Sequence, residues 1–248
     1  MSKAEALLVG LKEVNPANYN GWNGRNGCAG CELDVENLQK ILEPLNYNVK
    51  TLKTSKATAE NILKELENAA SILQKGDIFV FFYAGHGGQQ PDENGDELDG
   101  RDETLIAYDR EIIDDELNKI WLEMKAGVRI VMISDSCNSG SNYRRIGTNV
   151  SNPTPIAPIP DQKAVEDMGA QMIHMGGCRD GFSSMGHANG GEFTLALVSA
   201  WKDGGFDGNY HRFYEEACGF IATGQKPQYN EYGPVTEAFK EQKPFTVE

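Results

Sequence analysis

Two short polar segments, each placed directly after an apolar run, contain the residues of this sequence that are best suited to chemistry. Asp135 and Cys137 follow the apolar run 129–134 within RIVMISDSCNSG, and His86 follows the run 78–83 within IFVFFYAGHGG. A thiol becomes a good nucleophile when a neighbouring imidazole takes its proton or stabilises its thiolate. The two segments therefore predict a nucleophile, Cys137, that is assisted by His86.

Alternating apolar and amphipathic segments predict the elements that must position these residues. We expect strands at 6–11, 47–52, 78–83, 128–134 and 171–175, and helices at 31–45, 58–73, 114–125 and 192–202. Near-continuous apolar strands separated by helices are typical of a parallel sheet covered on both faces, an α/β three-layer sandwich. Reacting groups gather beyond the carboxyl ends of such strands, so His86 and Cys137 are expected at the same edge.

Each reactive residue also has a purely structural interpretation. A cysteine at a strand end is often a small buried hydrophobe, and a histidine between glycines is often structural. The sequence GHGG is not a phosphate loop, because the Lys-Ser/Thr partner is missing. The two strand ends taken together favour catalysis, with the backbone N–H groups of Gly87 and Cys137 as donors to an oxyanion.

Two carboxylates are expected beside the nucleophile. Asp135 lies two residues before Cys137 and shares its side of the strand, and Asp34 falls in the first turn of the first long helix. Paired carboxylates suit a cationic side chain, above all the planar guanidinium of arginine. The alternatives are a carboxylate that only stabilises a helix start, for Asp34, and a turn residue, for Asp135.

The CAGC segment, Cys28 to Cys31, suggests a zinc or a redox site. Zinc prefers four ligands, and Cys178 and Cys218 do not form a second pair, which disfavours zinc.

Composition restricts the classes of protein. The 248 residues carry a formal net charge of −14, which disfavours nucleic-acid and anionic membrane partners. No stretch approaches the roughly 20 apolar residues that span a bilayer. Five cysteines without framework spacing suit a reducing compartment. We expect a cytoplasmic monomer without an organic cofactor.

The two motifs are similar to those of a known family. FFYAGHGG followed by ISDSCNSG resembles the His and Cys motifs of caspase-like cysteine peptidases, most closely the metacaspases of prokaryotic type. A spacing of about 50 residues between such a His and Cys is itself a recognised caspase signature. GCAGCELDVENL, DELDGRDETLIAYD and HMGGCRDGFSS resemble further family segments, so the likeness runs from residue 7 to about 199.

The resemblance implies a caspase-like fold with a mostly parallel six-stranded sheet between helices. It implies one peptidase domain over 1–248, with a large-subunit-like part at 1–145, a proline-rich linker at 146–163 and a small-subunit-like part at 164–248. Cys137 would be the nucleophile and His86 the acid and base. Cys31, Asp34 and Asp135 would line a first pocket for Arg or Lys, and Ala84 stands where many relatives have a pocket serine.

The resemblance also implies calcium. Asp102, Asp114 and Asp115 match three family calcium ligands, whereas Arg144 replaces a fourth acidic ligand and opposes a cation. A helix cap is the alternative for Asp114 and Asp115.

We therefore expect a cysteine endopeptidase that cleaves after Arg or Lys in peptide and protein substrates. Self-processing is expected at Arg144-Arg145 and Lys163, which flank the proline-rich linker. The alternatives are an inactive caspase-like scaffold, disfavoured by the intact motifs, and a cysteine-dependent α/β hydrolase, disfavoured because the histidine precedes the cysteine.

Overall fold

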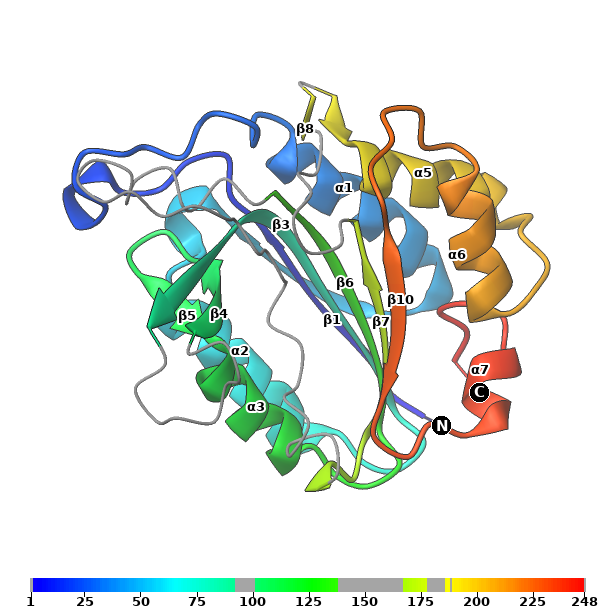
Figure 1. Ribbon diagram of the computed structural model, residues 1–248. Coiled ribbons are helices and arrows are strands. Elements are labelled where there is room, and N and C mark those ends of the chain that lie inside the picture. Colours follow the sequence, from blue (N-terminus) through cyan, green and yellow to red (C-terminus); the bar gives the residue numbers. More distant parts are fainter. Residues whose placement is uncertain (1, 92–100, 138–166, 178–185, 188, 248) are drawn as a thin grey trace.

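The computed structural model describes residues 2–91, 101–137, 167–177, 186–187 and 189–247. For residues 101, 137, 186 and 187 the backbone alone is described. These residues form a central β-sheet with helices on both of its faces (Figure 1). The linker at 146–163 and Arg144 lie outside the described residues, and the division of the chain around the linker stays a prediction.

Within the described residues, six strands make up the row of the main sheet. They are β1 (Ala4–Gly10), β2 (Asn48–Lys53), β3 (Ile78–Pro91), β6 (Arg129–Cys137), β7 (Gln171–Gly176) and β10 (Gln228–Tyr232). Their order is β10-β7-β6-β3-β1-β2, and all neighbours are parallel except β10, which is antiparallel to β7. The predicted sandwich with a mostly parallel six-stranded sheet is confirmed.

Short strands extend this sheet at the carboxyl end of β3. The last residues of β3 pair with β4 (Arg101–Ile106), and β4 pairs with β5 (Glu111–Ile113), both antiparallel. A separate hairpin joins β8 (Gly186–His187) and β9 (Gly190–Gly191).

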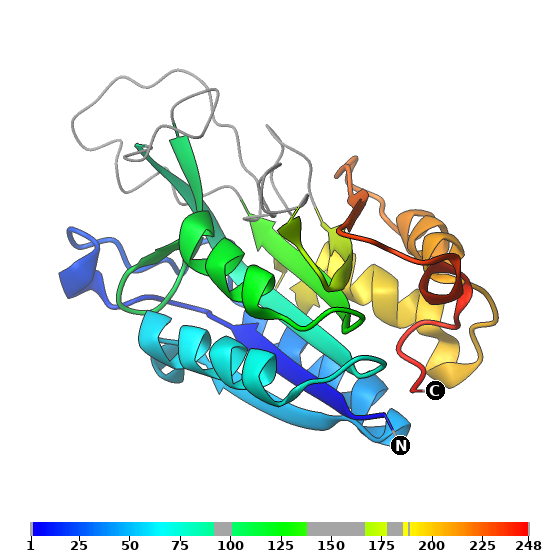
Figure 2. The same cartoon turned by 90° about the horizontal axis from the view of Figure 1, so that it is seen from below.

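Helices on the two faces complete the three layers (Figures 1 and 2). On one face lie α1 (Cys31–Leu42), α5 (Glu192–Trp201), α6 (Tyr210–Cys218) and α7 (Glu237–Glu241); on the other lie α2 (Ala59–Ile72) and α3 (Asp114–Glu123). Thr58 caps α2, because its side chain accepts a hydrogen bond from the N–H of Asn61.

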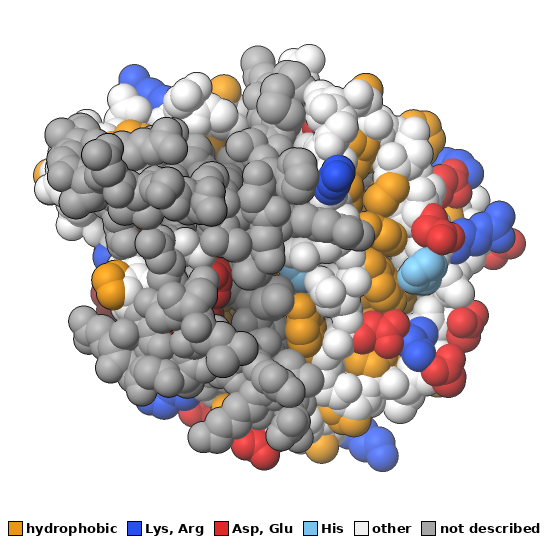
Figure 3. All heavy atoms as spheres, in the orientation of Figure 1, with side chains coloured by type: hydrophobic (Ala, Val, Ile, Leu, Met, Phe, Trp, Pro, Cys, Tyr) orange, Lys and Arg blue, Asp and Glu red, His pale blue; other side chains and the backbone are white. Residues whose placement is uncertain are grey.

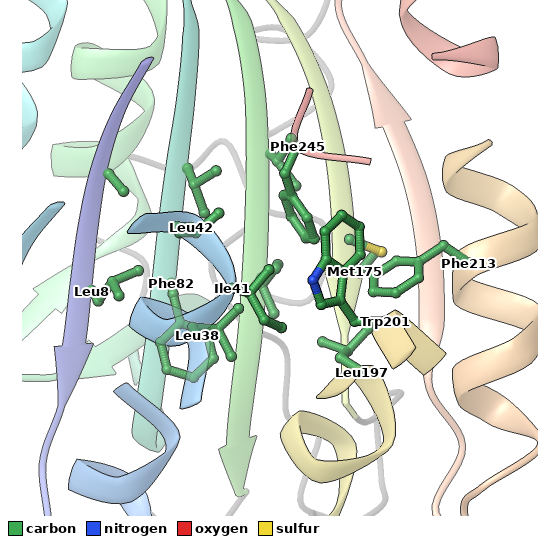
Figure 4. Close-up of a cluster of buried hydrophobic side chains, with 14 of the residues drawn as sticks. Leu8, Leu38, Ile41, Leu42, Phe82, Met175, Leu197, Trp201, Phe213 and Phe245 are labelled. Atoms are coloured by element: carbon green, nitrogen blue, oxygen red, sulfur yellow. The ribbon is translucent and has the colours of Figure 1, made fainter. Parts of the chain in front are cut away.

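Alternation of side chains along the strands divides the apolar residues into two cores. Successive strand residues point to opposite faces. The core under α1, α5 and α6 includes Leu8, Phe82 and Ile133, and the core under α2 and α3 includes Leu7, Phe81 and Met132. Figure 4 shows the first core, where side chains of α1 and α5 meet those of the sheet. Each fully buried Leu or Phe contributes about 1.5–3 kcal/mol, so both helical layers are held firmly to the sheet.

Two strands run further than the sequence predicts. β3 continues past Tyr83 through His86 to Pro91, and β6 continues past Ser134 to Cys137. Glycines at 85, 87 and 88 disfavour a strand, yet hydrogen bonding to β6 and β4 outweighs this local preference. His86 and Cys137 are therefore strand residues whose backbone positions are set by the sheet.

The helical spacing predicts one apolar face formed by Leu33, Leu38, Ile41, Leu42 and Leu45. This prediction is wrong for Leu33, which is 40% exposed, because the buried face of α1 is formed by Val35, Leu38, Ile41 and Leu42.

In the described part of the surface seen in Figure 3, acidic and basic side chains lie next to one another. The helices for which the structure gives coordinates include none with the length and apolar character of a membrane span.

A buried histidine lies next to the reactive end of β6. His174 of β7 is fully buried, and its Nε2 lies 2.9 Å from the hydroxyl of Ser134, the residue before Asp135. Burial lowers the pKa of His174 from 6.5 to about 4, because the charged form loses its hydration. The folded protein therefore keeps this imidazole neutral at pH values where the unfolded chain would protonate it.

This difference predicts acid sensitivity. Above pH 6.5 the contribution of neutral His174 is fully present, and it is lost as the pH falls from there to about 4, by at most about 3 kcal/mol. Urea unfolding between pH 7 and 4 should show a shallower loss of stability for His174→Gln than for the wild type. His211→Gln removes an exposed histidine and serves as the control. Parallel pH profiles for wild type and His174→Gln would contradict the assignment.

Candidate active site

The sheet brings positions 86 and 137 together. In the parallel pairing of β3 with β6, His86 is the register partner of Cys137, and Ala84 is the partner of Asp135. Neighbouring strands are about 4.8 Å apart, and partners across a sheet share a face. The predicted juxtaposition of the two residues is thus present in the backbone; the side chain of Cys137 lies outside the described part.

The imidazole of His86 is held by the segment that leads into α1. Its Nε2 lies 2.6 Å from the carbonyl oxygen of Gly24 and 3.2 Å from Sγ of Cys28, and its ring centroid is 5.0 Å from that of Trp22. A carbonyl oxygen can only accept, so Nε2 carries a proton. In the neutral imidazole, Nδ1 is therefore the nitrogen that can accept a proton.

The backbone around His86 is fixed by a tyrosine. The hydroxyl of Tyr83 lies 2.7 Å from the carbonyl oxygen of His86 and 2.9 Å from that of Ile106, within reach as a donor to both. A Cβ on residue 85 would lie 2.5 Å from this hydroxyl, so only glycine fits at position 85. This contact explains the Tyr-x-Gly-His spacing of the motif.

The thiols of Cys28 and Cys31 are coupled to one another and to His86. A hydrogen bond from Cys31 lowers the pKa of Cys28 to about 6, with a further contribution from His86 and against the effect of burial. Donating that hydrogen bond raises the pKa of Cys31 well above the usual range, and burial adds to this. Burial alone would lower the pKa of His86, but the Cys28 thiolate and the Gly24 carbonyl raise it overall. Cys28 and His86 therefore each stabilise the charged form of the other.

Asp34 and Asp135 meet beneath the β8–β9 hairpin and the start of α5. Both oxygens of Asp34 lie 2.9 Å from the N–H of Gly191, and Oδ2 of Asp135 accepts hydrogen bonds from the N–H and hydroxyl of Thr194 at 2.9 and 2.7 Å. A Cβ on Gly191 would lie 2.1 Å from Oδ2 of Asp135. The two carboxylates are thus both in contact with one glycine, and both are buried.

Placing two carboxylates together in the protein interior changes their chemistry. Burial, followed by the nearby charge of Asp135, raises the pKa of Asp34 to about 8, although the hydrogen bond from Gly191 opposes the shift. At neutral pH the pair therefore shares fewer than two negative charges. A cation that replaced the proton would be stabilised by both carboxylates.

The other predicted residues lie close to this site. Cys31 is the first residue of α1, Ala84 is fully buried in β3, and Gly87 follows His86 and is the register partner of Leu105 in β4. The predicted residues of β3 and β6 thus lie at and next to the pairing of His86 with Cys137, and Cys31 and Asp34 lie in the first turn of α1.

The predicted calcium ligands lie at a different place. Asp102 is in β4, and Asp114 and Asp115 begin α3, next to the paired residues Thr104 and Ile113. Among the described residues, no group of three or more His, Cys, Asp or Glu side chains is arranged to hold a metal ion. Calcium binding by Asp102, Asp114 and Asp115 stays a prediction.

Several residues of the site could not be assigned a role from the sequence. Gly24, Trp22 and Tyr83 position His86, and Gly191 and Thr194 hold the carboxylates. The sequence indicates these residues only through their nearness to a motif. Every residue has a backbone carbonyl, and nearly every residue has an N–H, so contacts made by the backbone cannot be recognised from residue type. Cys28 was noticed for its spacing from Cys31, but its contact with His86 depends on the path of residues 11–30.

Comparison with known proteins agrees with this geometry. Residues 6–239 match the family model of the caspase domain (Peptidase_C14). Metacaspase-1 of Schizosaccharomyces pombe is 35% identical over 145 residues, which cover 56% of this chain and 34% of that protein. Metacaspase-1A of Aspergillus clavatus is 42% identical over 92 residues, covering 35% of this chain and 21% of that protein. The matches span about a third or less of these curated relatives.

Solved structures extend the likeness over the whole chain. The crystal structure of protein GSU0716 from Geobacter sulfurreducens has a TM-score of 0.83 and 33% identity, with 99% of each chain covered. Caspase-1 from Spodoptera frugiperda shares the fold, with a TM-score of 0.65 at 15% identity over 94% of this chain and 88% of that one. The His and Cys positions are paired across two parallel strands, and the caspase-domain model matches residues 6–239. The chain therefore belongs to the caspase-like family of cysteine peptidases, close to the metacaspases.

Proposed function

We propose that this chain is a cysteine endopeptidase in which Cys137 is the nucleophile and His86 the acid and base. The register that makes His86 and Cys137 partners on adjacent parallel strands carries the proposal. The contact between Nε2 of His86 and the Gly24 carbonyl supports the proposal, because this contact leaves Nδ1 of the neutral ring as the proton acceptor.

The chemistry follows from these roles. Nδ1 of His86 takes the thiol proton of Cys137, and the thiolate attacks the carbonyl carbon of the scissile peptide bond. Backbone N–H groups of Gly87 and Cys137 stabilise the resulting oxyanion. His86 returns the proton to the leaving amine as the C–N bond breaks. Water, activated by His86, then hydrolyses the thioester and frees the enzyme.

The proposal includes cleavage after Arg or Lys. Asp34 and Asp135 are its basis, because two buried carboxylates in contact with Gly191 place negative charge beside the proposed nucleophile. A guanidinium can donate to both carboxylates and stays charged, so it replaces the proton on Asp34 and the N–H donor of Gly191. Cys31 and Ala84 form the remaining apolar surroundings of that side chain. Self-cleavage after Arg144, Arg145 or Lys163 stays a prediction, because these residues lie outside the described ones.

The identity of the nucleophile is testable, since His86 contacts Cys28 and is also the register partner of Cys137. A peptidyl chloromethyl ketone ending in Arg should alkylate Cys137, located by peptide mass mapping. Cys137→Ala should lose the labelling and lower turnover of an Arg-ended fluorogenic peptide at least about a thousandfold. Cys28→Ser should still be labelled at position 137. Labelling of Cys28, or full turnover by Cys137→Ala, would overturn the assignment; absence of any turnover by the wild type would favour an inactive scaffold.

The basis of specificity is testable with matched substrates. Citrulline has the shape of arginine without its charge, so the wild type should strongly prefer the Arg peptide. Asp135→Asn keeps an acceptor for Thr194 but removes the charge, and should lower kcat/KM for the Arg peptide by about a hundredfold, equivalent to about 2.7 kcal/mol. Glu36→Gln, which changes an exposed carboxylate of α1, is the control. Equal cleavage of both peptides by the wild type would exclude this pocket chemistry.

The raised pKa of Asp34 predicts a pH dependence. Below pH 8 the carboxyl is mostly protonated and neutral, and it gains its charge as the pH rises through about 8. The value of kcat/KM for an Arg peptide, which reports the free enzyme, should therefore rise between about pH 7 and 9. The same rise should be missing in Asp34→Asn and present in Glu36→Gln. An unchanged profile in Asp34→Asn would assign the rise to another group.

A further inference from the structure

The neighbouring thiols of Cys28 and Cys31 take no part in the proton transfers and bond changes of peptide cleavage. Sγ of Cys28 contacts Nε2 of His86, and the N–H of Cys31 donates to the carbonyl of Cys28. The other described free cysteine, Cys218, ends α6 on the far side of α5 from α1. A pair of neighbouring thiols of unequal acidity, one of them next to an imidazole, is the arrangement used for thiol–disulfide chemistry.

The backbone geometry allows Cys28 and Cys31 to form a disulfide. The N–H of Cys31 donates to the carbonyl of Cys28 at 3.1 Å, which closes a turn of four residues just before α1. In such a turn the first and fourth Cα atoms lie within about 7 Å, and disulfides span Cα separations of about 4.4–6.8 Å. Joining the two sulfurs therefore needs no unfolding of α1.

The two thiols differ in the way that a disulfide-forming pair requires. Cys28 is the more acidic, because Cys31 donates a hydrogen bond to it and His86 contributes positive charge; Cys31 keeps its proton. Cys28 is therefore the thiolate that attacks an oxidant, and Cys31 is the thiol that resolves the product. Both residues are buried, at 1% and 6% exposure, which restricts the reaction to small oxidants.

We propose that Cys28 and Cys31 form a peroxide-sensitive dithiol that closes to a disulfide beside His86. The Cys28 thiolate attacks one oxygen of hydrogen peroxide, giving Cys28 sulfenic acid and, with one proton, water. The thiol of Cys31 then displaces the sulfenic hydroxyl, forming the S–S bond and a second water. Two thiols and one peroxide thus give one disulfide and two waters. In the disulfide form Cys28 has no charge, so His86 loses its anionic neighbour. An effect of this loss on peptide cleavage rests on the proposed function, whereas the formation of the disulfide does not.

The sequence allows a direct test. Cleavage after Arg25 and Lys40 releases a tryptic peptide, residues 26–40, that contains both thiols and no other cysteine. The test uses the full chain carrying Cys137→Ala, so the proposed nucleophile cannot react. After brief treatment with hydrogen peroxide and then iodoacetamide, the peptide should be unalkylated and about 2 Da lighter than the reduced form. Dithiothreitol should restore two alkylation sites.

Matched variants separate the two roles. With Cys31→Ser, the sulfenic acid of Cys28 should persist and be trapped by a cyclic 1,3-diketone. With Cys28→Ser, Cys31 should remain a free thiol at the same peroxide dose. Cys218→Ser is the control and should leave the disulfide unchanged. Two alkylated thiols after peroxide, or a disulfide from this peptide to another cysteine, would overturn the proposal. None of these readouts depends on peptidase activity, so failure here and failure of the proposed function are distinguishable.

Discussion

The register between β3 and β6 is the constraint on which the site depends. Parallel strands fix residues opposite one another through their ladder of hydrogen bonds, and a shift by one residue would turn every side chain to the other face. In this register His86 lies opposite Cys137, and Ala84 lies opposite Asp135. The same ladder therefore sets the spacing of the reacting pair and places the carboxylate two residues away. The cores on both faces keep this register, because a slip by one residue would move Phe81 from one core into the other, where the side chains are packed around different neighbours.

Around this register, the protein concentrates charge in its interior and arranges each charge against a partner. His86 is compensated by Cys28 and by the Gly24 carbonyl, and the carboxylates of Asp34 and Asp135 accept hydrogen bonds from Gly191 and Thr194. Burying charges costs free energy unless they are paired and hydrogen bonded. The lowered pKa of Cys28 indicates that its negative charge is well stabilised, whereas the raised pKa of Asp34 indicates that compensation of its charge is incomplete. Such incomplete compensation is typical of sites that bind charged ligands or transfer protons.

Much of the fold and the outline of the site could be predicted from the sequence. The apolar runs of β1, β3, β6 and β7 are near-continuous because they are buried on both faces, and this pattern is strong enough to indicate a parallel sheet. His86, Cys137, Asp135 and Asp34 follow from residue type and position. The ends of β3 and β6 could not be predicted, because glycine is a poor strand former and only the neighbouring strands stabilise it there. The contacts of Gly24, Gly191 and Cys28 depend on loops whose paths are set by tertiary packing. The exposure of Leu33 shows that a set of leucines does not define a helix face unless the spacing fits.

The end of β1 has a consequence for how this domain can diverge. A Cβ on Gly10 would lie 2.4 Å from the carbonyl oxygen of Cys31 and 2.6 Å from Val35, so the first turn of α1 rests directly on the strand backbone. The inner side of the helix is thereby anchored to the strand, whereas Leu33 on its outer side is exposed. Sequence drift on that outer side leaves the inner geometry intact. The surface of α1 can thus adapt to new surroundings over evolution while Asp34 keeps its place.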